Sequence, residues 1–209
     1  MEIKDCIDQL VKGKSLSQKQ MVDAAESIMN GSATNSQTAA FLVALRMKGE
    51  TSDEISGLAI VMREKSLHPQ ISDSINLLDT CGTGGDGSGT FNVSTASAIV
   101  AASAGIRVAK HGGRAISSKC GSGDLLESVG VKIDLGPEGV AECINKIGIG
   151  FMYAFIFHPA MRLTNDTRRE IGIRTIFNIV GPLTNPANAG HQLVGVPSPD
   201  LVPVITDAL

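Results

Sequence analysis

Residues 79–95 read DTCGTGGDGSGTFNVST, and this stretch decides the expected fold. The apolar run Ile75 to Leu78 precedes it and is typical of a buried strand that ends in a glycine-rich turn. Five glycines lie within eight positions, and an apolar helix is expected from Val93. Glycine-rich backbone can direct several N–H groups at one anion, and a helix N-terminus adds a favourable dipole. We therefore expect a strand, a phosphate-binding loop (the first loop, residues 79–95) and a helix.

The chain that follows alternates between helical and strand patterns. Such alternation predicts a parallel sheet whose ligands bind at the carboxyl ends of the strands. The expected helices are 93–104, a segment near 124–129 and a segment after Pro137, and the expected strands are 106–109, 131–134 and 151–155.

The segment before Ser66 has only helical patterns. Two capping boxes, Ser17 with Gln20 and Thr51 with Glu54, each begin a helix, and residues 38–47 are apolar enough for a buried helix between them. A first short helix is expected to place four apolar residues on one face: Ile3, Ile7, Leu10 and Val11.

We therefore expect an α/β fold with a small all-helical N-terminal domain, residues 1–70, joined by a hinge to a parallel-sheet α/β domain, residues 71–209. The helical segment 164–185 is a candidate to pack with the helical domain. The final segment, residues 198–209, carries a helix-start signal and stops before any C-cap, so we expect a chain truncated at its C-terminus.

A second loop, residues 110–122, reads KHGGRAISSKCGS and follows the second expected strand. Neighbouring parallel strands end at the same edge, so this loop is expected beside the first. Its three permanent cations, paired glycines and serines are groups that bind phosphate oxygens. The two loops together predict a polyphosphate site.

Other phosphate-binding folds fit this pattern less well. Gly82, Gly84 and Gly87 satisfy G-x-G-x-x-G, but a dinucleotide fold needs an acidic residue at the second strand, where this chain has Lys110 and His111. A P-loop is excluded because no Gly-Lys-Ser/Thr follows the glycines.

Composition narrows the functional classes further. The 209 residues carry a net charge of −3, which argues against nucleic acid or an anionic membrane as the partner. The N-terminus lacks the apolar run of a signal peptide, and no later run is long enough to span a bilayer, so we expect a cytoplasmic protein. The four cysteines lack the pairing of zinc sites or disulfide frameworks, and we expect bystander thiols: Cys6, Cys81, Cys120 and Cys143.

The two loops carry a resemblance to a known family. The motifs DTxGTGGD, NVST and KHGxR, together with RREIGIRTIFN and GPLTNP, are similar to the signature of the anthranilate phosphoribosyltransferase family, over nearly the whole chain. The resemblance implies a fold of the nucleoside phosphorylase/phosphoribosyltransferase type, a homodimer with its site at the hinge, and a magnesium cofactor. The implied reaction joins anthranilate to 5-phosphoribosyl 1-pyrophosphate in tryptophan biosynthesis.

The resemblance also implies the site residues. Arg168, Gly82 and Gly113 would contact anthranilate, and Ser94 would also contact Mg²⁺. Further magnesium ligands of the family, a paired Asp-Glu, would lie beyond Leu209. The phosphoribosyl pyrophosphate would be surrounded by Gly82, Gly85, Asp86, Thr90, Asn92, Val93, Ser94, Thr95, Lys110, His111, Gly112, Gly113, Arg114, Ala115, Ile116, Ser117, Ser118 and Ser122.

Two residues depart from the family pattern, and both concern the acceptor. Gly113 replaces an asparagine whose amide would help hold anthranilate, and Phe155 replaces a common proline. No residue stands out as a catalytic acid or base: His111 is expected to bind, and His158 to pack. The implied chemistry is displacement at the anomeric carbon, driven by alignment and charge stabilisation. Two alternatives stay open: a pyrimidine nucleoside phosphorylase-like enzyme, and a non-catalytic nucleic-acid-binding relative.

Overall fold

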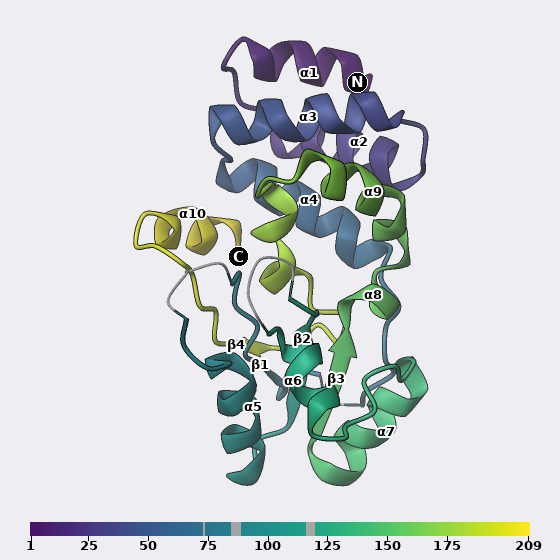
Figure 1. Ribbon diagram of the computed structural model, residues 1–209, viewed down its shortest axis with the longest axis vertical. Coiled ribbons are helices and arrows are strands. Elements are labelled where there is room, and N and C mark those ends of the chain that lie inside the picture. Colours follow the sequence, from purple (N-terminus) through teal and green to yellow (C-terminus); the bar gives the residue numbers. More distant parts are fainter. Residues whose placement is uncertain (73, 85–88, 116–119) are drawn as a thin grey trace. The chain divides into compact units, whose positions relative to one another are not determined.

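The computed structural model describes residues 1–72, 74–84, 89–115 and 120–209, and these form two compact units (Figure 1). The helical unit contains Met1–Lys65, Pro159–Thr184 and Asp200–Leu209. The sheet unit contains Ser66–His158 and Asn185–Pro199. This spatial grouping is not a single cut near residue 70, because two later segments return to the helical unit.

The helical unit is built around four N-terminal helices. Helix α1 packs on α2 and α3, α2 packs on α4, and α9 packs on α2 and α3. Its elements are α1 (Ile3–Val11), α2 (Gln18–Met29), α3 (Asn35–Lys48), α4 (Ser52–Glu64), η1 (Pro159–Met161), α9 (Arg162–Ile171), η2 (Ile176–Asn178), η3 (Gly181–Thr184) and α10 (Leu201–Ala208).

Both predicted capping boxes are confirmed. The backbone N–H of Gln20 donates to Ser17 Oγ, and that of Glu54 donates to Thr51 Oγ1. A third box, Thr34 with Gln37, begins α3; it has the same Thr-x-x-Gln pattern, and the sequence reading missed it. The predicted face of α1 is wrong at Val11, which is exposed because Cys6 takes the buried position between Ile3 and Leu10.

The sheet unit holds one parallel sheet in the order β3-β2-β1-β4, which confirms the expected fold class. Helix α5 packs against β2 and β3, and α7 packs against β3. Its elements are β1 (Leu78–Asp79), α5 (Val93–Ser103), β2 (Val108–Gly112), α6 (Ser122–Ser128), α7 (Pro137–Ile147), β3 (Ile149–Tyr153), α8 (Ala154–Phe157) and β4 (His191–Gln192).

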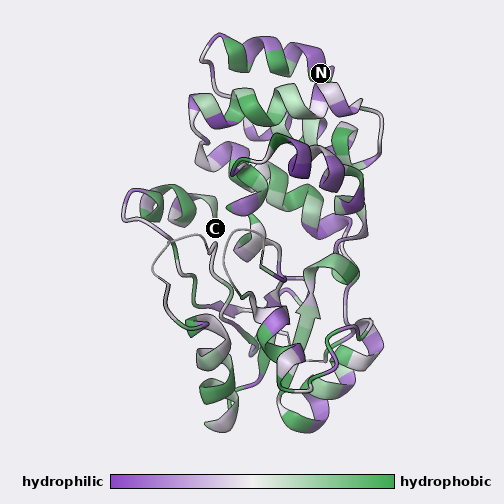
Figure 2. Cartoon of the chain, in the orientation of Figure 1, coloured by the Kyte–Doolittle hydropathy of each residue, from purple (hydrophilic) through white to green (hydrophobic). Residues whose placement is uncertain are grey.

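The core of the sheet unit lies between its strands and helix α7. Leu77, Ala109 and Met152, from three neighbouring segments, pack with Val140 and Ile144 of α7. In the hydropathy colouring of Figure 2, α5 is apolar along most of its length, whereas α9 is largely polar. Among the described residues, no helix combines the length and apolar character that crossing a membrane requires.

Three strand predictions are corrected by the structure. The first strand is only Leu78–Asp79, and Ile75 before it is exposed. Residues 131–134 form no strand, and the Val131 N–H donates to Leu126 O. The last expected strand ends at Tyr153, where α8 begins, and β4 has no predicted counterpart.

Candidate functional site

The first and second loops follow adjacent parallel strands, as expected. Strand β1 ends in Asp79 and β2 ends in Gly112, and the two strands pair with each other. Side-chain contacts join the loops, among them Lys110 Nζ to Ser94 Oγ at 3.2 Å, Thr95 Oγ1 to Ser122 Oγ at 3.0 Å, and Asn92 Nδ2 to Gly121 O at 3.2 Å. Expected binding residues of both loops therefore lie together at one edge of the sheet.

Lys110 is the most buried cation of this edge. Only 2% of the residue is exposed, and burial lowers the pKa of its ammonium group. Its Nζ donates to Ser94 Oγ, which belongs to the first turn of α5. A buried ammonium that has given up hydration is ready to accept an anion, because the penalty of desolvation is already present in the free protein.

Arg114 is held by acidic side chains of α6. Its Nη1 and Nη2 donate to the two carboxylate oxygens of Glu127 at 2.7 and 2.9 Å, and Nη1 lies 3.4 Å from Asp124 Oδ1. The guanidinium also lies over the Tyr153 ring, 5.9 Å from its centroid. Arg114 lowers the pKa of Glu127, so a phosphate bound here would compete with an ionised carboxylate.

Asp124 closes the second loop. Its Oδ2 accepts from the backbone N–H groups of Ala115 and Gly121, each at 2.8 Å. These two backbone hydrogen bonds, with smaller contributions from Arg114, lower the pKa of Asp124. The carboxylate thus fixes the residues on either side of 116–119.

Two glycines are required by close backbone approaches. A Cβ on Gly82 would lie 2.9 Å from Gly195 O, and one on Gly121 would lie 2.5 Å from the Ala115 nitrogen. Gly113 is different: nothing lies within 4 Å of its Cβ position, and its φ is not positive. Position 113, where the resemblance implies an asparagine, therefore has space for a side chain.

His111 contacts His158 across the buried side of the site. Their Nε2 atoms are 3.2 Å apart and their rings meet edge to face, with centroids 5.0 Å apart. Both residues are buried. This contact agrees with the expected packing of His158 and places it directly against a predicted donor-binding residue.

Arg168 belongs to α9 of the helical unit. Its guanidinium lies 5.1 Å above the centroid of the Phe177 ring, and burial lowers its pKa. Within the described ranges it has no carboxylate partner, whereas the neighbouring Arg169 pairs with Asp166. A desolvated guanidinium without an anion is suited to a planar carboxylate.

The remaining predicted residues divide into described and undescribed ones. Thr90 and Val93 are exposed, and Ala115 is half-buried. Five predicted binding residues lie outside the described residues: Gly85, Asp86, Ile116, Ser117 and Ser118.

The described residues offer little that holds a metal by itself. In the described parts of the chain, no three His, Cys, Asp or Glu side chains gather as ligands. Ser94 supplies one hydroxyl oxygen at the loop edge. This donor set fits Mg²⁺ carried mainly by substrate phosphates and water, with one protein oxygen added, and not a preformed cage.

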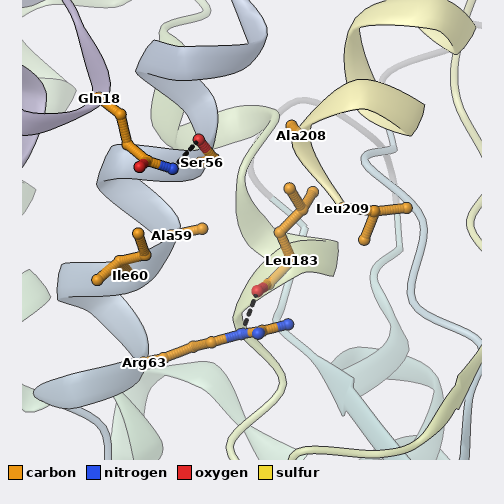
Figure 3. Close-up of a pocket in the computed structure, with 8 residues that line it drawn as sticks. All are labelled: Gln18, Ser56, Ala59, Ile60, Arg63, Leu183, Ala208 and Leu209. Atoms are coloured by element: carbon orange, nitrogen blue, oxygen red, sulfur yellow. Dashed lines mark hydrogen bonds between the residues drawn. The ribbon is translucent and has the colours of Figure 1, made fainter.

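The helical unit contains a separate pocket of about 210 Å³, shown in Figure 3. Gln18 Nε2 donates to Ser56 Oγ at 2.9 Å, and Arg63 Nε donates to Leu183 O at 2.7 Å. None of the predicted site residues lines it. Its lining is Gln18, Ser56, Ala59, Ile60, Arg63, Leu183, Ala208 and Leu209.

Sequence reasoning missed the residues that hold the loops in place. Asp79 and Asp124 each accept from loop backbone N–H groups, yet neither was predicted as a binding residue. Gln192 of β4 donates to Asp79. Asp79 could have been found, because it is a lone carboxylate at the end of an apolar strand. Nothing in the sequence around Gln192 indicates its role.

Comparison with known proteins identifies the family. A profile described as "Glycosyl transferase family, a/b domain" matches residues 74–209. The chain belongs to this glycosyl transferase family. The helical bundle domain of the same glycosyl transferase family matches residues 4–66.

Curated relatives of this glycosyl transferase confirm the resemblance. Anthranilate phosphoribosyltransferase of Chloroflexus aggregans is 56% identical over 209 residues, which are all of this chain and 61% of the relative. The enzyme of the same name from Dehalococcoides mccartyi is 58% identical over 207 residues, 99% of this chain and 60% of the relative. The chain thus spans about three fifths of the length of these relatives.

Solved structures agree with this assignment. Anthranilate phosphoribosyltransferase from Thermus thermophilus matches with a TM-score of 0.90 at 43% identity, over 98% of this chain and 62% of that one. The Saccharomyces cerevisiae enzyme in complex with PRPP and Mg matches with a TM-score of 0.89 at 30% identity, over 99% of this chain and 61% of that one.

Proposed function

We propose that the sheet unit binds 5-phosphoribosyl 1-pyrophosphate between its first and second loops. One observation carries the proposal: Lys110, a buried cation at the end of β2, bonds to Ser94 at the start of α5, which links both anion-binding loops at one edge of the sheet. The solved yeast relative with PRPP and Mg bound supports this choice of ligand.

The proposed acceptor is anthranilate. The planar guanidinium of Arg168 would donate two parallel hydrogen bonds to its carboxylate. The anthranilate nitrogen forms a bond to the anomeric carbon, the bond from that carbon to pyrophosphate breaks, and pyrophosphate leaves with the electron pair. The nitrogen then loses its proton to solvent. The loops contribute hydrogen-bond donors that are held against the departing pyrophosphate. Stabilising this charge lowers the barrier to an oxocarbenium-like transition state.

We propose Mg²⁺ as the cofactor, held mainly by the diphosphate oxygens, with Ser94 as one protein ligand. When bound, it would supply neutralising charge to the leaving group. The yeast relative solved with PRPP and Mg, and a variant of it solved with Mg bound, support the choice of metal. A cytoplasmic homodimer acting in tryptophan biosynthesis completes the proposal by resemblance.

The proposal is tested by calorimetric titration of the chain with phosphoribosyl pyrophosphate and Mg²⁺, followed by anthranilate. We expect donor binding that inorganic pyrophosphate displaces, and anthranilate binding that increases when the donor is present. Pyrophosphate release should require anthranilate. Binding of a pyrimidine nucleoside with phosphate in place of the donor, or displacement of the donor by an oligonucleotide, would contradict it.

A further inference from the structure

We infer that Asp79 is the positioning residue of the donor site, because its one carboxylate fixes the starting residues of both phosphate-binding loops. Asp79 has no assigned role in the reaction. This inference rests on the proposed function, since it concerns the loops that would hold the donor.

The hydrogen bonds of Asp79 join three segments that are far apart in sequence. Its Oδ1 accepts from the backbone N–H of Cys81, 3.0 Å away, in the first loop. The same oxygen accepts from the backbone N–H of His111, 3.2 Å away, in the second loop. Its Oδ2 accepts from Gln192 Nε2 of β4 at 3.2 Å. The positions of the two loops are thereby coupled through one oxygen atom, Asp79 Oδ1.

Burial shows that Asp79 acts through the loops and does not contact the substrate. The residue is 0% exposed, so no ligand in the solvent can reach its oxygens. Lys110 and His111, two of the predicted phosphate-binding residues, belong to β2, the strand that Asp79 bonds at the His111 backbone. A shift of the His111 backbone would move the Lys110 side chain away from Ser94, which it now contacts.

A buried carboxylate is a costly means of holding a backbone. Burial raises the pKa of Asp79, partly offset by hydrogen bonds from Asn185 and the His111 backbone and by the charge of Lys110. Charged acceptors make stronger hydrogen bonds than neutral ones, which gives the loops a firmer anchor than an apolar residue would provide.

The experiment compares Asp79→Ala with the conservative Asp79→Asn. The Asn carbonyl can still accept from both loop amides, and its amide can donate to a rotated Gln192. We expect Asp79→Ala to raise the dissociation constant for phosphoribosyl pyrophosphate by about tenfold or more, the effect of losing hydrogen bonds to a charged group. In Asp79→Asn the dissociation constant for the donor should lie within about threefold of that of the unsubstituted chain. Anthranilate affinity, measured without the donor, should change less than donor affinity in both.

Gln192→Met is the matched control, because it removes the hydrogen bond from Gln192 to Asp79 Oδ2 and leaves both loop bonds intact. We expect its donor affinity to stay within about twofold of the unsubstituted chain. A donor affinity in Asp79→Ala equal to that of the unsubstituted chain would overturn the inference. Equal loss of donor affinity in Asp79→Asn and Asp79→Ala would overturn it too, because the hydrogen bonds that Asn retains would then not contribute to donor binding.

Amide hydrogen exchange separates this inference from the proposed function. The Cys81 and His111 amides should be protected in the unsubstituted chain and in Asp79→Asn, and both should exchange faster in Asp79→Ala. The Val108 amide, bonded to Gly148 O at 2.8 Å, is the internal reference. If the unsubstituted chain does not bind the donor, the proposed function fails while exchange still tests Asp79. Should Asp79→Ala not fold, fast exchange of either amide in the unsubstituted chain overturns the inference, and joint protection supports it.

Discussion

Arg114 shares its guanidinium between Glu127, Asp124 and the Tyr153 ring before any ligand binds. If it binds donor phosphate, as proposed, it does so in competition with Glu127. Arg114→Ala should therefore weaken donor binding by about tenfold, the effect of losing a hydrogen bond to a charged group. Glu127→Gln should tighten it, since the competing charge is gone. Calorimetric titration checks both, and equal donor affinity in all three proteins would show that Arg114 only braces the loop.

Replacing Gly113 with asparagine tests the acceptor site. Gly113→Asn meets no atom within 4 Å of the new Cβ and no positive φ, so the fold should accept it. An added amide should tighten anthranilate binding by about 0.5–1.5 kcal/mol, the net contribution of one hydrogen bond. Donor affinity should not change. Titration of anthranilate in the presence of donor measures the effect, with Gly113→Ala as the control for the Cβ alone.

Arg168 allows a test of the acceptor with a neighbouring control. Arg168→Lys keeps the charge but loses the planar fork, and we expect anthranilate affinity to fall about tenfold while donor affinity stays the same. Arg169→Ala, on the same helix and paired with Asp166, should change neither. Loss of donor binding in Arg168→Lys would instead indicate a role outside the acceptor site.

Among the elements, the second loop depends most on a tight backbone approach. Gly121 precedes α6, and a Cβ there would lie 2.5 Å from Ala115 N and 2.6 Å from Arg114 C. Backbone atoms cannot move aside as a flexible side chain can. Gly121→Ala should lower the free energy of unfolding by about 1–3 kcal/mol, the range for overpacking. Urea denaturation measures it, and Gly113→Ala in the same loop should lie within about 0.5 kcal/mol of the unsubstituted chain.

Among the elements, the N-terminal ends of helices α2 and α4 were predicted best from the sequence. The boxes Ser17 with Gln20 and Thr51 with Glu54 each satisfy a donor three residues away, so nothing distant is needed to form them. The strand expected at 131–134 failed for the opposite reason. Whether an apolar run becomes a strand depends on its tertiary contacts, and the Val131 N–H of this run donates to Leu126 O.

For the molecule as a whole, Asp79 links function to stability. Because burial raises the folded-state pKa of Asp79 above its unfolded value, ionising this carboxyl lowers the stability of the native protein. Asp79→Asn should therefore raise the free energy of unfolding at pH 7. The gain should shrink as pH falls toward the ordinary value of 3.8, where the unfolded carboxyl is protonated too. Urea denaturation at pH 7 and pH 4 checks this, and an equal gain at both would point to packing.

The site as a whole was predictable only in part. Both loops, and the placement of Lys110 and Arg114 beside the glycines, follow from strand alternation and local composition. The glycine pattern did not show that Gly82 approaches Gly195, because the two are far apart in sequence. Likewise, the sequence displays the cations of the second loop but not the carboxylates of Asp124 and Glu127 that engage Arg114.

From the sequence alone follow the fold class, the helical character of the N-terminal segment, the two glycine-rich loops and the family resemblance. These depend on periodicity, glycine chemistry and motif spacing, which are local along the chain. Only the tertiary structure decided that Asp79 bonds both loops and β4, and that His158 meets His111. Those contacts join residues that are brought together only by the parallel order of the strands, and one amino-acid pattern is compatible with many such pairings.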